Sequence, residues 1–189
     1  MWKFLKWVSL AGVRTEVSEI MSEMLSNELL ERASRVRLLL MDCDGVLTDG
    51  KLYFSKNGEE LKTFHVHDGQ GLKLWHNAGF KSGIITGRES KILLKRTSEI
   101  GINFVFQNSK DKVGDFKKIL GQSGVVADEV AYVGDDLSDV ELLKSVGFPV
   151  LVADSPINLD DCLHYKTLKN GGCGAIREVV DFILKLNVK

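Results

Sequence analysis

The sequence has few cysteines, almost no net charge and no long apolar run. Its three cysteines, Cys43, Cys162 and Cys173, lack the spacing of a metal site and fit a reducing compartment, the cytoplasm, better than a disulfide framework. A net charge of −1 gives no electrostatic reason to bind nucleic acid or an anionic membrane. No stretch approaches the roughly 20 apolar residues that span a bilayer. The remaining composition, 44% hydrophobic and 27% charged residues, is typical of a soluble globular protein.

A length of 189 residues suits one domain with a small appendage. We expect the domain at 35–189 and a helical appendage at 1–34, because apolar residues within 16–35 recur at the spacing of an amphipathic helix. The first residues are basic and apolar, but they do not predict a signal peptide, because the apolar part is short and charged residues follow it closely. The appendage is a docking helix, retained upstream sequence or a weak interfacial anchor.

Short apolar segments alternate with segments of helical periodicity along the rest of the chain. The expected strands are 38–41, 81–87, 103–106, 130–133 and 149–153, and the expected helices are 72–77, 89–100, 111–120, 139–145 and 175–186. Such alternation with short connections predicts an α/β fold, a doubly wound, Rossmann-like parallel sheet in a three-layer sandwich.

An inserted β-hairpin is predicted after the first strand. Two strand-like segments, 51–54 and 61–66, flank Asn57-Gly58, a strong hairpin signal because both turn positions need positive φ. Apolar residues lie on both faces of this hairpin, and an isolated two-stranded hairpin is marginal in water. We therefore expect it to pack against something outside the core sheet.

Two carboxylates, Asp42 and Asp44, follow the apolar segment 38–41. Residues two apart point the same way as a strand ends, and this edge of a parallel sheet is where open α/β folds place their active sites. Two close like charges indicate a bound metal, acid/base chemistry or both. Taken alone, the motif is equally typical of a capped turn.

Further strand ends and helix starts supply groups of the same chemistry. Thr86 ends one expected strand, Lys112 opens a helix, and the acidic segment 134–139 ends another strand. Alone, Thr86 is typical of a turn and Lys112 of a solvated helix start. In this order they provide the nucleophile, proton donor, hydroxyl, cation and metal ligands that phosphoryl transfer requires.

The arrangement resembles the haloacid dehalogenase superfamily of phosphatases over about residues 36–187. The resemblance implies that Asp42 attacks phosphorus and becomes a transient aspartyl phosphate. Asp44 would protonate the leaving alcohol and then activate water. Thr86 and Lys112 would bind the phosphoryl oxygens. A carboxylate at the position of Asp44, where superfamily members that preserve the phosphoenzyme tend to have threonine, favours hydrolysis.

The same resemblance implies a magnesium site. Mg²⁺ would be held by the Asp42 carboxylate, the Asp44 backbone carbonyl and Asp135. Asp136 and Asp139 would orient the phosphate-binding lysine and metal-bound water.

A closer resemblance is to the cap-less 3-deoxy-D-manno-octulosonate 8-phosphate phosphatases, in the segments DGVLTDG, NGEELKTFHVHDGQG, IITGR, GDDLSD and GGCGAIREV. It implies a cytosolic Mg²⁺ enzyme of lipopolysaccharide sugar synthesis that acts on a phosphorylated 2-keto-3-deoxy sugar acid. It also implies a homotetramer assembled through the hairpin. The intervals from Asp44 to Thr86 and from Thr86 to Lys112 leave no room for a cap domain, so a neighbouring subunit is expected to complete the site.

Several positions bear on the substrate. Arg88 matches the octulosonate type, and Arg96 matches a basic position that reaches the substrate of an adjacent subunit. His67 and Cys173 stand where these phosphatases have arginine. The resemblance implies that the glycine segment 171–174 closes over a neighbouring active site, whereas the alternative is that it only turns the chain into the last helix.

Other interpretations remain open at this stage. A nonulosonate (sialic acid or KDN) 9-phosphate phosphatase shares the scaffold, and the same domain occurs as a weakly active oligomerisation partner in sugar-nucleotide synthesis. A phospho-accepting receiver domain fits the acidic spacing poorly. His65 and His67, alternate residues of an expected strand, are typical of a strand surface rather than of a metal site.

Overall fold

The computed structural model describes residues 27–159 and 162–187. Residues 27–35 are helical, Ala33 is fully buried in the core, and the Asn187 side-chain amide donates a hydrogen bond to the Ala33 carbonyl. The domain boundary expected at residue 34 therefore falls within a helix that packs on the core. The rest of the expected appendage, 1–26, lies outside the described residues. Within the described ranges no helix combines the length and the apolar character needed to cross a membrane.

Six parallel strands form the central sheet, in the order β5-β4-β1-β6-β7-β8. Their bounds are β1 Leu38–Met41, β4 Lys81–Ile85, β5 Phe104–Phe106, β6 Val130–Gly134, β7 Phe148–Leu151 and β8 Tyr165–Lys166. β1 lies between β4 and β6, with Leu38 in register with both Lys81 and Val130. The chain builds outward from β1 first on one side and then on the other, so the predicted doubly wound α/β fold is confirmed.

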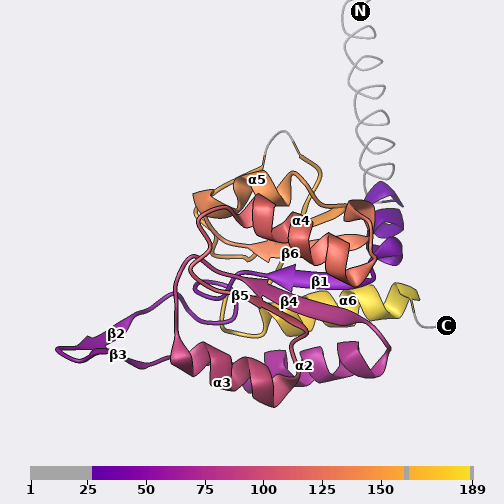
Figure 1. The fold of residues 1–189 in the computed structure, drawn as a ribbon. Coiled ribbons are helices and arrows are strands. Elements are labelled where there is room, and N and C mark those ends of the chain that lie inside the picture. Colours follow the sequence, from indigo (N-terminus) through magenta and orange to yellow (C-terminus); the bar gives the residue numbers. More distant parts are fainter. Residues whose placement is uncertain (1–26, 160–161, 188–189) are drawn as a thin grey trace, which may run out of the picture.

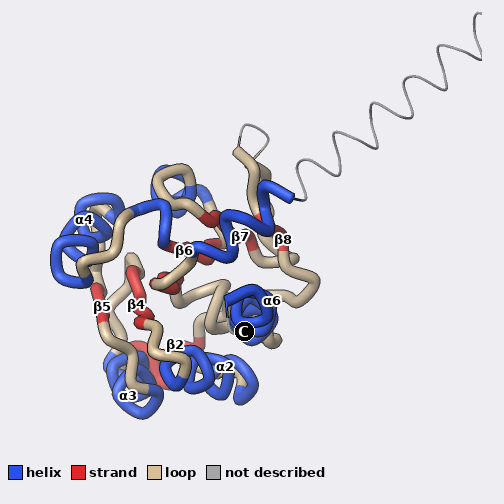
Figure 2. Tube along the Cα trace, turned by 90° about the vertical axis from the view of Figure 1, so that its right-hand side faces the viewer, coloured by secondary structure: helices blue, strands red, loops and turns tan. Residues whose placement is uncertain are grey.

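Helices cover both faces of this sheet (Figures 1 and 2). The helices of one face are α2 (Val66–Asn77), α3 (Lys91–Ile100) and α6 (Ala175–Asn187), and those of the other are α4 (Lys112–Ser123) and α5 (Val140–Leu143). Short 3₁₀ turns, η1 (Ala127–Glu129) and η2 (Leu137–Asp139), precede β6 and α5. Leu39 and Met41 pack into the first layer and Leu38 and Leu40 into the second. Burial on both faces explains the unbroken apolar sequence of β1.

The predicted hairpin is present and projects from the body of the molecule (Figure 1). Its strands are β2 (Tyr53–Ser55) and β3 (Gly58–Leu61), and Gly58 has φ 109°, a conformation that favours glycine. We call residues 51–65 the arm. The returning strand ends at Leu61, earlier than the expected 66, and the chain then runs back toward the sheet without strand pairing.

Helix α2 begins at Val66, so the expectation that His65 and His67 lie on a strand is wrong. His65 is the residue before the helix, and its Nδ1 accepts a hydrogen bond from the His67 backbone N–H at 3.3 Å. The early turns of α2 were missed because Gly69 and Gly71 are poor helix formers. Gly71 allows close packing of the two helices, since a methyl group there would lie 3.1 Å from the Cα of Arg177 in α6.

The glycine segment 171–174 packs against the loop that follows β1 in its own chain. The Gly172 N–H donates to the Val46 carbonyl at 2.9 Å, and a methyl group on Gly171 would overlap the carbonyl oxygen of Gly45. These glycines thus have a packing role within the subunit. The closure over a neighbouring site that the resemblance implies stays a prediction. Gly174, at φ 101°, leads into α6, as the alternative interpretation expected.

A methyl group at Gly171 should destabilise the protein. We expect Gly171→Ala to lower the free energy of unfolding by about 1–3 kcal/mol, the usual cost of overpacking, because the backbone of the β1 loop must shift. Gly121→Ala is the matched control, since a methyl there meets no heavy atom within 4 Å and α4 continues past it. That control should be stabilising by roughly 0.5–1 kcal/mol. Denaturant titration compares the two, and equal stabilities would contradict the packing role.

Candidate active site

A cleft opens at the carboxyl ends of the strands and has a volume of about 370 Å³. Its lining residues are Asp42, Asp44, Thr86, Gly87, Arg88, Ser109, Lys110, Lys112 and Ser138. The cleft therefore brings together the strand-end residues that the sequence singled out after β1 and β4 and at the start of α4. Parallel strands make this possible because their carboxyl ends all lie at one edge of the sheet.

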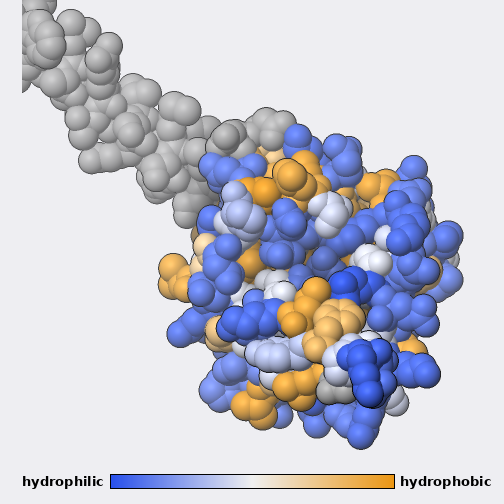
Figure 3. Space-filling model, turned by 90° about the vertical axis from the view of Figure 1, so that its left-hand side faces the viewer, coloured by the Kyte–Doolittle hydropathy of each residue, from blue (hydrophilic) through white to orange (hydrophobic). Residues whose placement is uncertain are grey.

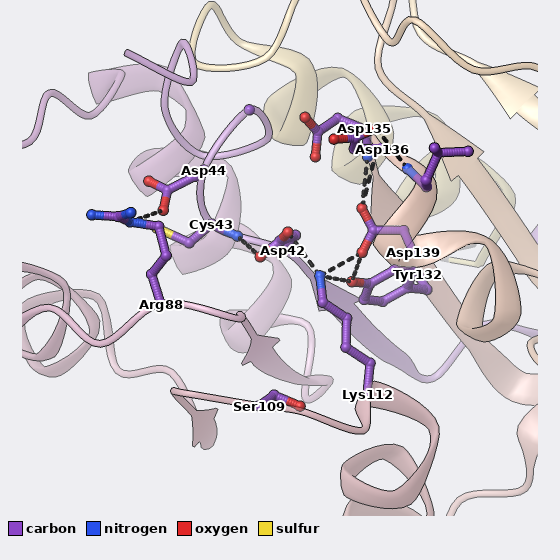
Figure 4. Close-up of polar contacts among 12 residues, drawn as sticks. Asp42, Cys43, Asp44, Arg88, Ser109, Lys112, Tyr132, Asp135, Asp136 and Asp139 are labelled. Carbon is purple, nitrogen blue, oxygen red and sulfur yellow. Dashed lines mark hydrogen bonds and ion pairs between the residues drawn. The ribbon is translucent and has the colours of Figure 1, made fainter. Parts of the chain in front are cut away.

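Asp42 lines the cleft, and two donors fix its carboxylate (Figure 4). Its Oδ1 accepts from the Cys43 backbone N–H at 2.6 Å, and its Oδ2 accepts from Lys112 Nζ at 2.8 Å. Its exposed fraction is 7%. A carboxylate held in this way presents its oxygens to the cleft in a defined orientation, as an attacking group requires.

Lys112 lies between Asp42 and a second carboxylate, Asp139, whose Oδ1 accepts from Nζ at 2.7 Å. Burial disfavours the charge of Lys112, but the two neighbouring carboxylates outweigh it and raise the pKa of the ammonium group. The side chain thus carries a full positive charge at neutral pH and can neutralise anionic oxygens in the cleft.

Asp139 can hold this lysine in a fixed place because further donors orient the Asp139 carboxylate. Oδ2 accepts from the backbone N–H groups of Asp135 at 3.0 Å and Asp136 at 3.3 Å, and Oδ1 also accepts from the Tyr132 hydroxyl. The orienting role expected of Asp139 thus has a geometric basis. Asp136 is exposed, and its side chain accepts from the Leu137 N–H at 2.7 Å.

Tyr132 was not identified from the sequence. It is fully buried in β6, and burial together with the Asp139 carboxylate raises its pKa well above the usual value, so the hydroxyl remains a donor. A polar residue in an otherwise apolar strand, two positions before Gly134, is the sequence feature that marks it.

Carboxylate oxygens of Asp42, Asp135 and Asp139 all lie within 4.8 Å of one another. Burial and the nearby charges of Asp139 and Asp42 raise the pKa of Asp135 to about 7, and burial also raises the pKa of Asp42. A side chain at Gly45 would overlap the Asp135 carboxylate, so the glycine keeps this carboxylate accessible. Crowded carboxylates of this kind fit a hard divalent cation. Asp139 is fully buried and its two oxygens accept four hydrogen bonds, whereas Asp42 lines the cleft and Asp135 is only partly buried. The expectation that Asp42 and Asp135 supply the side-chain ligands stays a prediction.

Asp44 lies at the side of the cleft between two cationic groups. Its Oδ1 is ion-paired with Lys62 Nζ, and its Oδ2 lies 3.4 Å from Arg88 Nε. The Arg88 guanidinium also lies over the Phe54 ring of the arm, 5.4 Å from the centroid. Lys62 was not identified from the sequence, because its side chain reaches the site only through the path of the returning arm.

Thr86 lines the cleft directly after β4, and its backbone is hydrogen-bonded on both sides. Its N–H donates to the Phe106 carbonyl at 2.9 Å, and its own carbonyl accepts from the Ser109 N–H at 3.0 Å. Ser109 was missed from the sequence; its hydroxyl donates to Asp115 at 2.6 Å and it lines the cleft beside Thr86.

Arg96 does not reach this cleft within the subunit. Its guanidinium lies over the Phe64 ring at 5.7 Å, and Nη1 is 3.6 Å from Glu99. The expected contact of Arg96 with an adjacent subunit's substrate stays a prediction.

The chain is similar to known phosphatases in both sequence and structure. No protein-family model matches the chain. A relative from Yersinia pestis, the 3-deoxy-D-manno-octulosonate 8-phosphate phosphatase KdsC, is 40% identical over 160 residues, which cover 85% of this chain and 86% of the relative. The crystal structure of the phosphatase from Moraxella catarrhalis with magnesium, phosphate and KDO is 36% identical, has a TM-score of 0.78 and is matched over 85% of this chain and 92% of that one. A cobalt-bound phosphatase from Haemophilus influenzae is also 36% identical, with a TM-score of 0.79 over 82% of this chain and 91% of that one.

Binding of a divalent cation should depend on pH through Asp135. Because the folded-state pKa of Asp135 is raised to about 7, its contribution to stability without metal falls as the pH rises toward 7. Mg²⁺ relieves this repulsion and competes with the proton, so the increase in Tm caused by Mg²⁺ should be larger at pH 8 than at pH 6. Asp135→Asn, which cannot titrate at this position, should show a smaller increase that depends less on pH. Thermal unfolding with and without Mg²⁺ measures this, and an equal increase at both pH values in the unmodified protein would contradict it.

Proposed function

Because the chain belongs to the family of 3-deoxy-D-manno-octulosonate 8-phosphate phosphatases, we propose that this sugar acid phosphate is its substrate. The chain is a phosphoric monoester hydrolase of the haloacid dehalogenase type. The observation that carries the proposal is the cleft in which Asp42, fixed by Lys112, lies beside Asp44. This pairing supplies a nucleophile and a proton donor at one phosphoryl group.

In the first step an oxygen of Asp42 attacks phosphorus, and the bond from phosphorus to the sugar oxygen breaks. Asp44 gives its proton to that oxygen, so the sugar leaves as an alcohol. Lys112, already charged and 2.8 Å from Asp42, partly neutralises the phosphoryl oxygens, and the Thr86 hydroxyl donates a hydrogen bond to them.

In the second step water attacks the phosphorus of the aspartyl phosphate. Asp44, now a carboxylate, takes the proton of that water, and the bond from phosphorus to Asp42 breaks. Inorganic phosphate leaves and both aspartates return to their initial state. The reaction as a whole converts a phosphate ester and water into an alcohol and phosphate.

We assign Mg²⁺ to the carboxylates of Asp42 and Asp135 and to the backbone carbonyl of Asp44. The structure of the Moraxella relative contains a magnesium ion, and the carboxylate cluster of this chain fits the same kind of ion. When bound, the ion supplies positive charge to the phosphoryl group.

Arg88 supports the octulosonate over the nonulosonate substrate. It lines the cleft, and a guanidinium can pair with a sugar carboxylate through two hydrogen bonds. His67 and Cys173, which depart from the family pattern, are both exposed and do not line the cleft. The assembled cleft also argues against a weakly active oligomerisation partner.

A homotetramer is the assembly that we propose. The arm exposes large apolar side chains, namely Leu52, Tyr53, Phe54 and Leu61. Figure 3 views the molecule from the side toward which the arm projects, and hydrophobic groups lie there among charged ones. Other copies of the chain are the expected cover for this surface, and they would bring Arg96 to a neighbouring cleft. The three free cysteines support a cytoplasmic location, as lipopolysaccharide sugar synthesis requires.

Asp42→Asn should abolish phosphatase activity. An amide is a poor nucleophile, so we expect kcat to fall by at least about 10³-fold, in the range that loss of a nucleophile costs other enzymes. The measurement is phosphate release from 3-deoxy-D-manno-octulosonate 8-phosphate, from a nonulosonate 9-phosphate and from hexose phosphates, with Mg²⁺ and with a chelator. Near-normal turnover by the variant would refute the nucleophile, and preference for a hexose phosphate would refute the substrate.

Arg88→Ala should affect the sugar acid selectively. Losing a charge-assisted pair with the substrate carboxylate should raise KM by about 10- to 100-fold, which corresponds to the 1.5–3 kcal/mol of such bonds. The substrate p-nitrophenyl phosphate has no carboxylate and serves as the control, since its kcat/KM should change little. Equal losses on both substrates would instead indicate that Arg88 acts by supporting Asp44.

A further inference from the structure

We infer that Lys62 is a positioning residue that holds the carboxylate of Asp44 in place for both of its proton transfers. The inference rests on the proposed phosphatase reaction. In that reaction Asp44 must first give a proton to the leaving sugar oxygen and then take one from the attacking water. Each transfer needs the carboxyl group within hydrogen-bond reach of a different oxygen, so its orientation decides the rate.

Lys62 is buried in a way that demands a partner. Its side chain is only 3% exposed, whereas that of Lys51, at the other end of the arm, is 71% exposed. Lysine is almost never buried unless its ammonium group is paired, because removing that charge from water is costly. The partner is Asp44, through the ion pair of Nζ with Oδ1.

The carboxylate of Asp44 depends on side chains from other elements. Lys62, which follows β3, contacts one oxygen, and Arg88, which follows β4, lies 3.4 Å from the other. Asp42 differs, because the backbone N–H of the adjacent Cys43 holds it directly. The direction of Asp44 is therefore set by tertiary contacts, one of which comes from the arm.

Lys62 is better suited than Arg88 to hold Asp44 throughout the reaction. Arg88 lines the cleft and its side chain is 40% exposed, so it is available to the substrate carboxylate. Lys62 is not among the residues that line the cleft, and its side chain is only 3% exposed. It thus stays paired when substrate occupies Arg88, and it acts through Asp44 rather than on the substrate.

A test follows from the dependence on the leaving group. The value of kcat/KM reports phosphoryl transfer to Asp42, and a poor leaving oxygen needs the proton of Asp44 more than a good one does. We expect Lys62→Met to lower kcat/KM for the sugar acid phosphate by about 10- to 100-fold, part of the range that general acid catalysis supplies. Across aryl phosphates, its rate should fall more steeply than that of the unmodified enzyme as the leaving phenol becomes less acidic.

Two variants control for charge and folding. Lys51→Met removes an exposed lysine of the same arm and should leave both the rate and the leaving-group dependence unchanged. Lys62→Arg keeps the positive charge and should recover at least part of the normal leaving-group dependence. The Tm of each variant is measured beside its kinetics, and Lys62→Arg decides the question if Lys62→Met does not fold.

Combination with Asp44→Asn gives the last control. If Lys62 acts through Asp44, then Lys62→Met should cause no further loss in kcat/KM for p-nitrophenyl phosphate when Asp44→Asn is already present. The inference is overturned if Lys62→Met slows every aryl phosphate by one factor, if Lys62→Arg shows the same leaving-group dependence as Lys62→Met, or if the losses from Lys62→Met and Asp44→Asn multiply. An unmodified enzyme that hydrolyses aryl phosphates but not the sugar acid phosphate would refute the substrate alone, and the aryl series would still decide the role of Lys62.

Discussion

The ammonium group of Lys112 lies between the carboxylates of Asp42 and Asp139, and the arrangement of the cleft depends on this buried pair of contacts. Without the lysine, the ends of β1 and β6 would place like charges together in a poorly solvated space. Even with it, the pKa of Asp135 is raised to about 7 by burial and by its acidic neighbours. One cation from α4 thus balances part of the negative charge, and the remaining negative charge is what makes the site suitable for a metal cation.

The sheet provides the geometry for this balance. β1 lies between β4 and β6, so the residues that follow these strands converge on one edge. Tyr132, which is buried within β6, supports Asp139 because its hydroxyl donates a hydrogen bond to the Asp139 carboxylate. The lysine is consequently held from α4, β1 and β6 at once, and few motions of one element can displace it without breaking a charged hydrogen bond.

The sequence predicted the features that arise from local pattern. The sheet and its helices followed from alternating apolar segments, and the convergence of Asp42, Thr86 and Lys112 followed from their places at strand ends and a helix start. β8 was missed because two residues carry no periodicity. Lys62 was missed because its contact with Asp44 depends on the direction in which the arm returns, and no pattern within residues 51–65 records that direction.

The contact between the glycine segment 171–174 and the loop after β1 has a consequence for the newly made chain. The loop that carries Asp44 and Gly45 is synthesised long before the backbone of residues 171 and 172 that packs against it. Since domains fold as units, the loop that follows β1 acquires this support only when α6 and the segment before it are available. A chain that stops before residue 171 therefore has every proposed catalytic group yet lacks the backbone that packs against the loop of Asp44.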